Sequence, residues 1–437
     1  MKVRTTVAAA FLLLGANAAG AEDFFEMSES EPTRSADRDE RAIDLSATFT
    51  QRIHYAVTEQ RESFPFRRED RGLASVRSDL LLTARHRPAS DLVIQVAGLA
   101  SYDAKLNDDP ATVEVEQTYV EWGMTPAFNI KTGRQIISLG ESNYFQIADR
   151  INPIDERAFG LAELRESSLP VTSTRLSYYQ SRWGVDLVAL HEFRQNLYDE
   201  PRGDFDPYIA LRDQPLAIEE DTPDTFMIVP DIAGRLFWSL PWGDVALFAS
   251  RLHNREARPL KAGADVLTLD YPQITLLGAS GNLVLGNWLL KSEYAFSDGD
   301  LYHVEHDENT QTLSAEGQAH QLMVGGRYTG ISNLTLDVEL LNTIISSVDG
   351  SLDEDRARTQ GVANLEYEML NDDLVASLTY MGWVNEPASM LRARMDYAVR
   401  DDIVLFGGAI GYSASDDAML APYRNNDRVF VGVTINL

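Results

Sequence analysis

The sequence predicts an all-β fold, a transmembrane antiparallel up-and-down β-barrel of roughly 16–18 strands, with about eighteen as the best count. Three observations predict it. Apolar and polar residues alternate along most of the chain, the connections take turns at being short and long, and the N-terminus resembles that of an exported protein. The chain has 437 residues, with 67 Asp and Glu against 38 Lys and Arg, and a formal charge of −29. This acidic balance argues against a nucleic-acid partner, because nucleic acid binds basic surfaces.

The N-terminus predicts export from the cytoplasm. Residues 1–21 have the pattern of a secretory signal peptide, with two basic residues, a short apolar run and the cleavage site Ala19-Gly20-Ala21. Residues 22–43 are acidic and poor in bulky apolar side chains, so we expect a flexible periplasmic leader. The barrel is expected to occupy residues 44–437, in the outer membrane.

Residues 334–340 illustrate the alternation. Leu334, Leu336, Val338 and Leu340 alternate with Thr335, Asp337 and Glu339. A period of two is that of a strand with one face toward lipid and the other toward the lumen, so the apolar set should face lipid. Segments of this kind begin near Asp44, Leu73, Asp91, Ala111, Ala127, Leu169, Arg182, Phe226, Gly243, Tyr271, Asn287, Gly317, Asn333, Arg356, Asp373, Ser389, Asp401 and Arg428.

The lengths of the connections separate a membrane barrel from a soluble sandwich. Short connections alternate with long ones, and a soluble sandwich has no reason to place its long loops at one end, whereas an outer-membrane barrel does. Most of the long connections are acidic, as solvated loops usually are. The long connections are 57–71, 140–168, 195–225, 254–270, 298–316 and 346–355.

No motif indicates catalysis. The chain has no cysteine and no G-x-S-x-G elbow. The run 302–308 has side chains that could bind a metal, but it lacks the H-E-x-x-H order, and a solvated acidic loop explains it better. The sequence therefore predicts a protein that is not an enzyme and has no cofactor. A hydrolase that uses His54, His191 or His320 is the weaker alternative.

The polar faces of the predicted strands carry many basic residues, against the acidic trend of the chain. One interpretation is a lattice of salt bridges along the barrel wall. The other is a basic pore that favours anionic or amphiphilic solutes, and both can hold together. The candidate lumen-lining residues are Arg52, Arg77, Lys131, Arg175, Arg235, Lys291, Arg327, Arg356, Arg358, Arg392 and Arg394.

One stretch resembles a known family. Its pieces are Gly133-Arg134-Gln135, Leu139-Gly140-Glu141-Ser142, Ile151-Asn152-Pro153-Ile154-Asp155 and Leu169-Pro170-Val171. This order resembles the signature of a proteobacterial outer-membrane family, the domain of unknown function 1302, although an aromatic residue is more usual where Leu139 stands. The family is similar in style to the alginate-export porins. The resemblance implies a long-loop barrel that accompanies RND-type exporters of lipidic or hydrophobic compounds, and it implies no catalyst.

The same stretch is expected to narrow the pore. Asn152 followed by Pro153 is typical of a helix start, so we expect a short helix from Pro153 to about Arg165. Its mixed charge suggests partners inside the barrel, and we expect residues 139–168 to fold inward. A helix that lies outside over the rim is the alternative. The candidate constriction and selectivity residues are Arg134, Glu141, Asp149, Arg150, Asn152, Asp155 and Arg165.

Taken together, these features predict an outer-membrane channel. It would pass small anionic or amphiphilic (lipidic) solutes as a component of an RND-linked export system. The expected partners are outer-membrane lipid, the solute and periplasmic RND components. A closed barrel that acts as a receptor or adhesin through its acidic loops is the alternative.

Overall fold

The structure is a computed structural model. It describes residues 43–58, 72–106, 110–161, 164–201, 203–209, 217–224, 231–262, 266–307, 312–416 and 418–437. The predicted signal peptide and nearly all of the predicted leader lie outside the described residues. No helix in the described part of the chain is long and apolar enough to cross a membrane.

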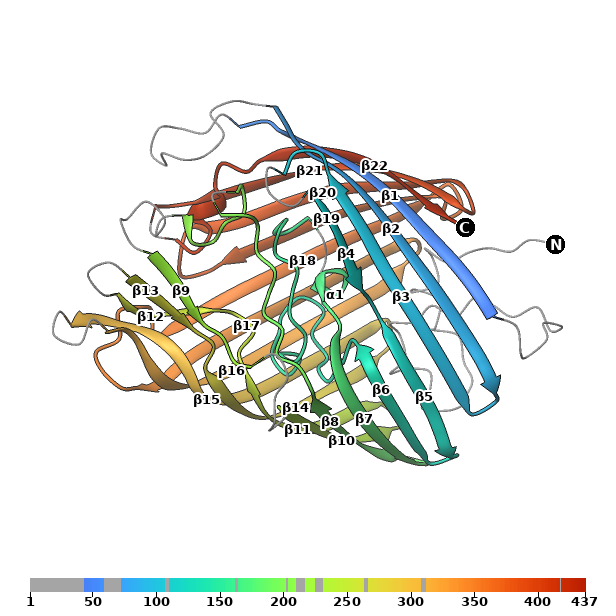
Figure 1. The fold of residues 1–437 in the computed structure, drawn as a ribbon, viewed down its shortest axis with the longest axis horizontal. Coiled ribbons are helices and arrows are strands. Elements are labelled where there is room, and N and C mark those ends of the chain that lie inside the picture. Colours follow the sequence, from blue (N-terminus) through green and yellow to red (C-terminus); the bar gives the residue numbers. More distant parts are fainter. Residues whose placement is uncertain are drawn as a thin grey trace.

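The described residues form a closed antiparallel β-barrel of 18 strands, which confirms the predicted fold class (Figure 1). The barrel closes where β1 pairs with β22. Strands β4 and β5 share one wall position, because both pair with β3. The wall strands are β1 (Ile43–Ala56), β2 (Gly72–Ala89), β3 (Leu92–Asp103), β4 (Ala111–Val115), β5 (Thr118–Thr125), β6 (Phe128–Gln135), β7 (Val171–Gln180), β8 (Trp183–Leu190), β10 (Ile232–Leu240), β11 (Gly243–His253), β14 (Gln273–Leu285), β15 (Trp288–Asp307), β16 (Thr312–Ile331), β17 (Leu334–Val348), β18 (Ala357–Met369), β19 (Leu374–Trp383), β20 (Ala388–Arg400), β21 (Ile403–Ala414) and β22 (Arg428–Asn436).

The strand starts agree closely with those predicted from alternation. All but two lie within two residues of the prediction. β10 begins at Ile232 rather than Phe226, and β16 begins at Thr312 rather than Gly317. The register of β17 confirms the predicted faces, because Asp337 and Glu339 are 1% and 0% exposed while Leu340 is 46% exposed.

Three further strands lie in the long connections and were not predicted. They are β9 (Ala217–Asp221), β12 (Arg258–Ala262) and β13 (Val266–Asp270). β13 pairs with β12 and also runs parallel to β9, while β12 joins β16 through Lys261 and Thr312. They lie at the loop end of the barrel, beside the ends of β15 and β16 (Figure 1).

The other end of the barrel carries tight turns. Asn333 and Gly286 adopt positive φ angles of 63° and 61° in two such turns, the conformation that tight hairpins require. In barrels of this class the tight turns face the periplasm and the long loops face the exterior. We use the terms turn end and loop end for the two rims.

The wall is uneven in height. β15 and β16 have 20 residues each, whereas β6 and β8 have 8 and β7 has 10. Figure 1 shows β6, β7 and β8 as short ribbons beside the longer β2 and β3. At Gln135 the chain leaves the low part of the wall and enters the lumen.

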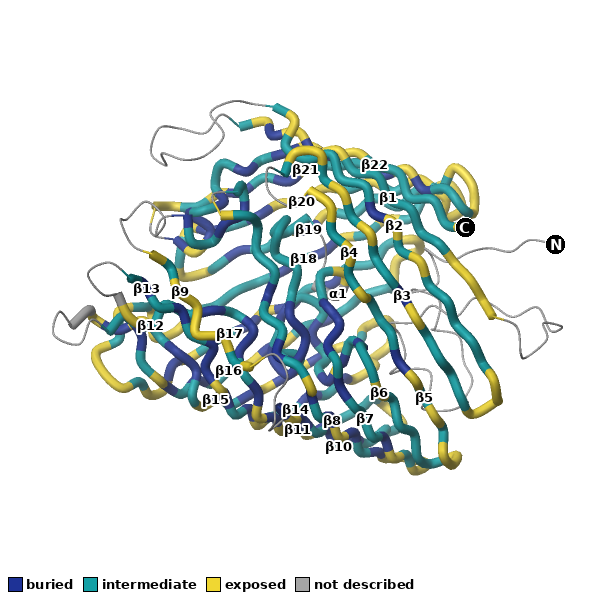
Figure 2. The backbone as a smooth tube through the Cα atoms, viewed as in Figure 1, coloured by how far each residue is buried: buried dark blue, intermediate teal, exposed yellow. Residues whose placement is uncertain are grey.

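Residues 136–170, the inner segment, run inside the barrel between β6 and β7. Much of the first half of this segment is buried, together with the inner faces of β8 to β18, which are dark blue in Figure 2. The predicted helix was wrong in extent. In the described residues the segment has one helix, α1 (Leu164–Ser167), of 4 residues.

The physical reason lies in the partners of the expected helix start. The Asn152 side chain accepts a hydrogen bond from the Ile137 amide at 3.1 Å and donates one to the Ile137 carbonyl at 2.6 Å, so it does not cap a helix. Ile154 and Asp155 then form extended bridges with Ser168 and Leu197.

Candidate functional site: the lumen and its inner segment

The inner segment first covers an apolar stripe of the wall. Ile137, Leu139, Phe145, Ile147 and Ile151 are at most 6% exposed. Without the segment, the inward-facing apolar side chains of the wall would face water, and burying them stabilises the inward position. The wall residues in the same cluster include Val188, Ala233, Phe248, Leu276, Ala295, Met323, Leu341 and Val362.

A wall carboxylate holds the turn of the segment. Glu293 on β15 is 1% exposed. It accepts hydrogen bonds from the backbone amides of Glu141 at 2.8 Å, Ser142 at 3.3 Å and Ala148 at 2.7 Å. A Cβ atom at Gly140 would lie 2.8 Å from both carboxylate oxygens of Glu293, so this close approach requires glycine.

β17 supplies two more carboxylates. Glu339 accepts the Ser142 hydroxyl at 2.6 Å and the Asn143 amide at 3.0 Å, and Asp337 accepts the Asn143 side-chain amide at 3.0 Å. Lys291 lies 3.0 Å from Glu339 and 3.7 Å from Asp337. The Gly140-Glu141-Ser142 motif is therefore the part of the segment that contacts the buried charges of the wall.

The segment then crosses the lumen to the opposite wall. The Gly160 carbonyl accepts a hydrogen bond from Arg392 at 3.2 Å, and the Phe159 carbonyl accepts one from the Tyr412 hydroxyl. Ala158, Phe159 and Leu161 pack against a second cluster that includes Met390, Ile410 and Tyr412. The chain between Gln135 and Leu161 thus links β14–β17 with β20 and β21.

The structure brings four of the predicted constriction residues into this inner network. Asp149 accepts the Gly140 amide at 3.0 Å and also the Leu139 amide. Glu141 accepts the Asn282 side chain at 3.1 Å, and Arg150 pairs with Asp300 at 2.9 Å. Asn152, as described above, clamps the backbone of Ile137.

Asp155 pairs within the segment, with Arg157 at 2.6 Å. Burial raises the pKa of Asp155, but the hydrogen bond and the positive charge of Arg157 outweigh this effect and lower the pKa. For Glu156, burial and the nearby Glu256 carboxylate raise the pKa to about 8. The side chain of Arg165 lies outside the described residues.

Arg134 is a correction to the predicted site. It lies opposite Thr118 and Thr172 in the wall, and it alternates with Lys131, Gly133 and Gln135. Gln135 is buried inside, so Arg134 faces outward. The sequence prediction assigned Arg134 to the inward face of the strand, whereas the alternation along β6 places it on the outward face.

The lumen-lining candidates divide into covered and exposed groups. Arg235, Lys291 and Arg392 are at most 6% exposed. Arg235 and Arg175 both bind Asp186, at 2.9 and 3.1 Å, and Arg327 binds Asp337 at 2.7 Å. Arg358 binds Glu354 at 2.7 Å.

Arg356 is a second correction. It stands just before β18 at the loop end, is exposed, and donates to the carbonyls of Ile345 and Ser346 at 3.0 and 3.5 Å. It therefore supports the rim rather than lining the lumen.

Arg175, Arg327 and Arg358 are partly exposed, at 23%, 24% and 33% of their side chains, and further partly exposed cations lie on β1, β2, β6 and β20. Arg52 and Arg77 are register partners on β1 and β2 and share Asp79, at 2.5 and 2.8 Å. Their side chains are 39% and 24% exposed, so this part of the wall, the open wall, keeps cations accessible from the lumen. Arg394 on β20 pairs with Asp396 at 2.7 Å and lies 4.7 Å from the Phe406 ring, and Lys131 lies 3.8 Å from the Tyr119 ring.

The carboxylates are the functional residues that the sequence reasoning missed. Asp79, Asp186, Glu293, Asp337 and Glu339 fix the arginines or the inner segment. Each lies on a strand with its side chain inside, and the alternation of residues 334–340 had placed Asp337 and Glu339 on the polar face. The sequence did not show which arginines or which residues of the inner segment these carboxylates bind.

The three histidines of the hydrolase alternative lie in other surroundings. His54 packs edge-on against Phe430. His191 binds the Thr174 hydroxyl at 2.9 Å and His320 binds the Tyr294 hydroxyl at 2.8 Å. In the described part of the chain, no group of three or more His, Asp or Glu side chains could hold a metal ion.

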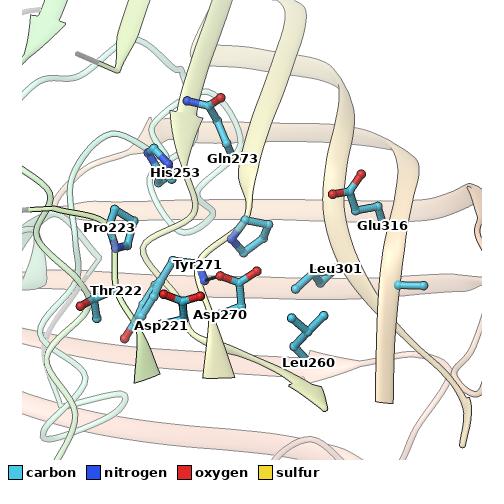
Figure 3. Close-up of a pocket in the computed structure, with 12 residues that line it drawn as sticks. Asp221, Thr222, Pro223, His253, Leu260, Asp270, Tyr271, Gln273, Leu301 and Glu316 are labelled. Atoms are coloured by element: carbon cyan, nitrogen blue, oxygen red, sulfur yellow. Dashed lines mark hydrogen bonds between the residues drawn. The ribbon is translucent and has the colours of Figure 1, made fainter. Parts of the chain in front are cut away.

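A cavity of about 420 Å³ lies at the loop end, beside β9, β13 and β14 (Figure 3). Asp221, Asp270 and Glu316 give it an acidic lining, and Leu260 and Leu301 give it apolar patches. The Tyr271 hydroxyl lies 2.8 Å from Gln195 Oε1 and 3.0 Å from Glu220 Oε2, and it can donate its one proton to either oxygen. His253, labelled in Figure 3, binds Asp231 at 2.8 Å.

A comparison with protein families decides the affiliation. The family described as "Protein of unknown function (DUF1302)" matches residues 85–400. The chain belongs to this family. The match runs from β2 to β20 and includes the inner segment, as the resemblance of residues 133–170 predicted.

Solved outer-membrane proteins share the fold at low sequence identity. OpdK from Pseudomonas aeruginosa is 9% identical, with a TM-score of 0.51, covering 90% of this chain and 99% of its own. OccAB4 from Acinetobacter baumannii is 9% identical, with a TM-score of 0.52, covering 91% and 98%. No curated protein sequence matches the chain. This likeness shows the fold of an outer-membrane β-barrel.

Proposed function

We propose that the protein is an outer-membrane channel that passes small anionic or amphiphilic solutes. The observation that carries the proposal is the arginine pair of the open wall. Arg52 and Arg77 oppose one carboxylate, Asp79, and both remain partly exposed to the lumen. Arg77 also lies opposite Asp103 of β3, so the pair is partly neutralised, but both guanidinium groups remain within reach of the lumen, where they can attract an anion.

Aromatic rings beside the cations support an amphiphilic solute. Arg394 lies over the ring of Phe406 at 4.7 Å, and Lys131 lies over the ring of Tyr119 at 3.8 Å. A solute with an apolar body and an anionic group would meet a ring and a cation together. Among the solved neighbours, OpdK is described with vanillate, a small anion, and the comparison is one of fold at 10% identity.

Ion selectivity tests the proposal. In planar bilayers under a KCl gradient, we expect the wild-type channel to prefer anions and the R52Q/R77Q variant to lose that preference, because Asp79 then stands uncompensated. R400Q is the matched control, since Arg400 pairs with Asp402 on an exposed turn. An unchanged reversal potential in R52Q/R77Q would contradict the proposal, and so would a protein that conducts no ions.

Outer-membrane location is part of the proposal. The signal-peptide pattern of residues 1–21 supports export, and the barrel fold supports insertion. Fractionation should recover the mature protein in the outer membrane, with heat-modifiable migration on gels. Recovery in the soluble periplasmic fraction would contradict it.

We propose the RND-type exporter as a partner on the family resemblance. The cargo would then be a lipidic or hydrophobic compound. Affinity capture of the channel after mild cross-linking should retain the periplasmic adaptor of such an exporter. If the captured channel carries no adaptor, although the cells express one, the channel is not part of this export route.

One observation favours a second function, that of a receptor. The loop-end cavity of about 420 Å³ has an acidic and partly apolar lining, suited to an amphipathic cation. Binding of such a cation by a barrel that conducts no ions would favour the receptor. Retained conductance would favour the channel.

A further inference from the structure

The hydrogen-bonded wall is incomplete between β4 and β7. β4 pairs with β3 along Gly98–Tyr102, and no strand in the described part of the chain pairs with its other edge. The next wall strand, β6, pairs with β5 only up to Thr118 and Arg134 and ends at Gln135. Beyond that level the described chain enters the lumen, so no strand among the described residues lies beside this free edge of β4.

The free edge lies at the level of the outer leaflet. Tyr102, an exposed aromatic residue, is opposite Ala111, and Val113 and Val115 are 85% and 53% exposed. Val113 is nine residues along the chain from the exposed Trp122 near the turn end. At about 3.3 Å per residue and a tilt of about 40°, that is about 23 Å, within an apolar band about 25 Å tall. Lipid-exposed sheet edges do not occur at this depth unless other groups satisfy them.

The outer surface below the free edge is polar. Arg134 faces outward there, six residues along β6 from Phe128, and forms no ion pair with any described residue. Thr132 and Thr174 bond to each other at 2.9 Å, and Thr174 also binds His191. Elsewhere the outward face is largely apolar, as at Leu322 and Leu340, which are 47% and 46% exposed. Arg251 of β11 also faces outward, but it donates a hydrogen bond to Gln273 at 3.0 Å. An arginine in this band indicates a polar path through the wall.

We call the interval between the free edge of β4 and the start of β7 the gap. Ion pairs bridge this gap on the side of the lumen. Arg194 donates to Glu114 on β4 at 2.6 Å and to the Pro170 carbonyl, just before β7, at 3.1 Å. Arg157 of the inner segment pairs with Asp155 at 2.6 Å and lies 4.0 Å from Glu114. Burial and the nearby Arg134 lower the pKa of Arg194. One side chain therefore joins the two borders of the gap, and the inner segment stands directly behind it.

We propose that this gap is a lateral opening through which an amphiphile with an anionic head passes between the lumen and the outer leaflet, with the Arg194–Glu114 pair as its latch. Arg134 and Arg194 would meet the anionic head, and the apolar chain would leave between Val113 and the lipid. The inference rests on the amphiphilic solute of the proposed function. Passage needs only side-chain motion, because no backbone hydrogen bond between described wall strands closes the gap.

Cross-linking tests the latch, and the chain suits it because it has no cysteine of its own. The E114C/R194C variant is bridged by a reducible bifunctional thiol reagent in proteoliposomes. Transfer of a fluorescent dodecanoate between lumen and bilayer should fall at least about tenfold on bridging and return on reduction, since the bridge removes the open state. KCl conductance should stay unchanged.

T50C/T434C is the matched control. Thr50 and Thr434 are hydrogen-bonded at 3.3 Å in the closed seam of β1 and β22, so bridging them should affect neither readout. Dodecanoate transfer that persists in bridged E114C/R194C would overturn the lateral opening, as would an equal loss of transfer and conductance. If the unbridged variant conducts KCl normally but does not transfer dodecanoate, the lateral opening is overturned and the proposed channel function is not. If it conducts no KCl, the proposed function itself is overturned.

A second copy of the chain is the competing occupant of the free edge. In V113C, disulfide-linked dimers in native membranes would show that another chain covers the edge, and would overturn the proposal. We expect V113C to stay monomeric and to react with a lipid-soluble maleimide as readily as L340C, which lies on the closed wall.

Discussion

The two sides of the lumen treat their charges in opposite ways. On β15 and β17 the carboxylates Glu293 and Glu339 are at most 1% exposed and bind backbone amides of the inner segment. On β1 and β2, Arg52 and Arg77 share Asp79 and stay partly exposed. The covered wall uses charge to position a polypeptide segment, and the open wall leaves charge available to a solute. Similar residue types in similar strands thus serve structure on one side and selectivity on the other.

The largest expected effect is on the stability of the covered wall. Glu339→Ala removes the nearer carboxylate of Lys291 and the acceptor of Ser142 and Asn143. Breaking a buried ion pair costs about 3–5 kcal/mol. The matched change on the open wall, Asp79→Ala, should cost less, about 1–3 kcal/mol, because Asp79 is 6% exposed but both of its arginines reach water. Urea unfolding in lipid vesicles measures both, and equal costs would erase the distinction between the walls.

A substitution in the inner segment should displace the segment while every wall residue stays unsubstituted. Gly140→Ala places a Cβ atom 2.8 Å from both oxygens of Glu293, which separates the carboxylate from the amides it binds. Losing part of these charge-assisted bonds costs about 2 kcal/mol. We expect higher single-channel conductance and greater sensitivity of cells to bulky antibiotics. Gly72→Ala, with open space around its Cβ, is the control, and no difference between the two would refute the role of the close contact.

A pH series tests the upper part of the inner segment. Because the pKa of Glu156 is raised from 4.5 to about 8, the folded protein holds the proton more tightly than the unfolded chain. Its contribution to stability is complete below about pH 4.5 and is lost as the pH rises toward 8. Glu156→Gln imitates the protonated form, so its thermal midpoint should match wild type in acid and exceed it increasingly up to about pH 8. A constant difference would argue against the raised pKa.

The smallest effect is expected on the open wall. Arg394→Gln breaks a partly exposed pair with Asp396, which is worth about 0–1 kcal/mol. The midpoint of unfolding should hardly move, while the preference for anions should fall. Reversal potentials and urea midpoints from the same preparation check this. A marked loss of stability would place Arg394 with the structural charges instead.

The strands of the wall and their two faces could be predicted from the sequence, because successive residues of a strand point alternately to the lipid and to the lumen. Asp337 and Leu340 are separated by that rule alone. Arg134 was misplaced for the same reason, since an error of one position exchanges the faces. The short strands β9, β12 and β13 were missed because five residues in an acidic loop give little periodic signal.

The contacts of the inner segment could not be predicted in the same way. Asn152 and Pro153 are ordinary helix-start signals, but the carbonyl and amide of Ile137 compete for the same side chain. The partner of Ser142 is Glu339, and nothing local in either stretch points to the other. Such pairings follow from barrel closure, which brings together strands that the sequence keeps far apart.

The inner segment also constrains the order of assembly. Ser142 and Glu339 are 197 positions apart, and Glu141 and Glu293 are 152 apart. Both ends of the segment are tied to neighbouring wall strands, so it cannot thread into the barrel from a free terminus. Contacts between such distant positions form slowly, because the connecting chain must be ordered before they contribute. The segment can therefore make its final contacts only after β15 and β17 have taken their places in the sheet.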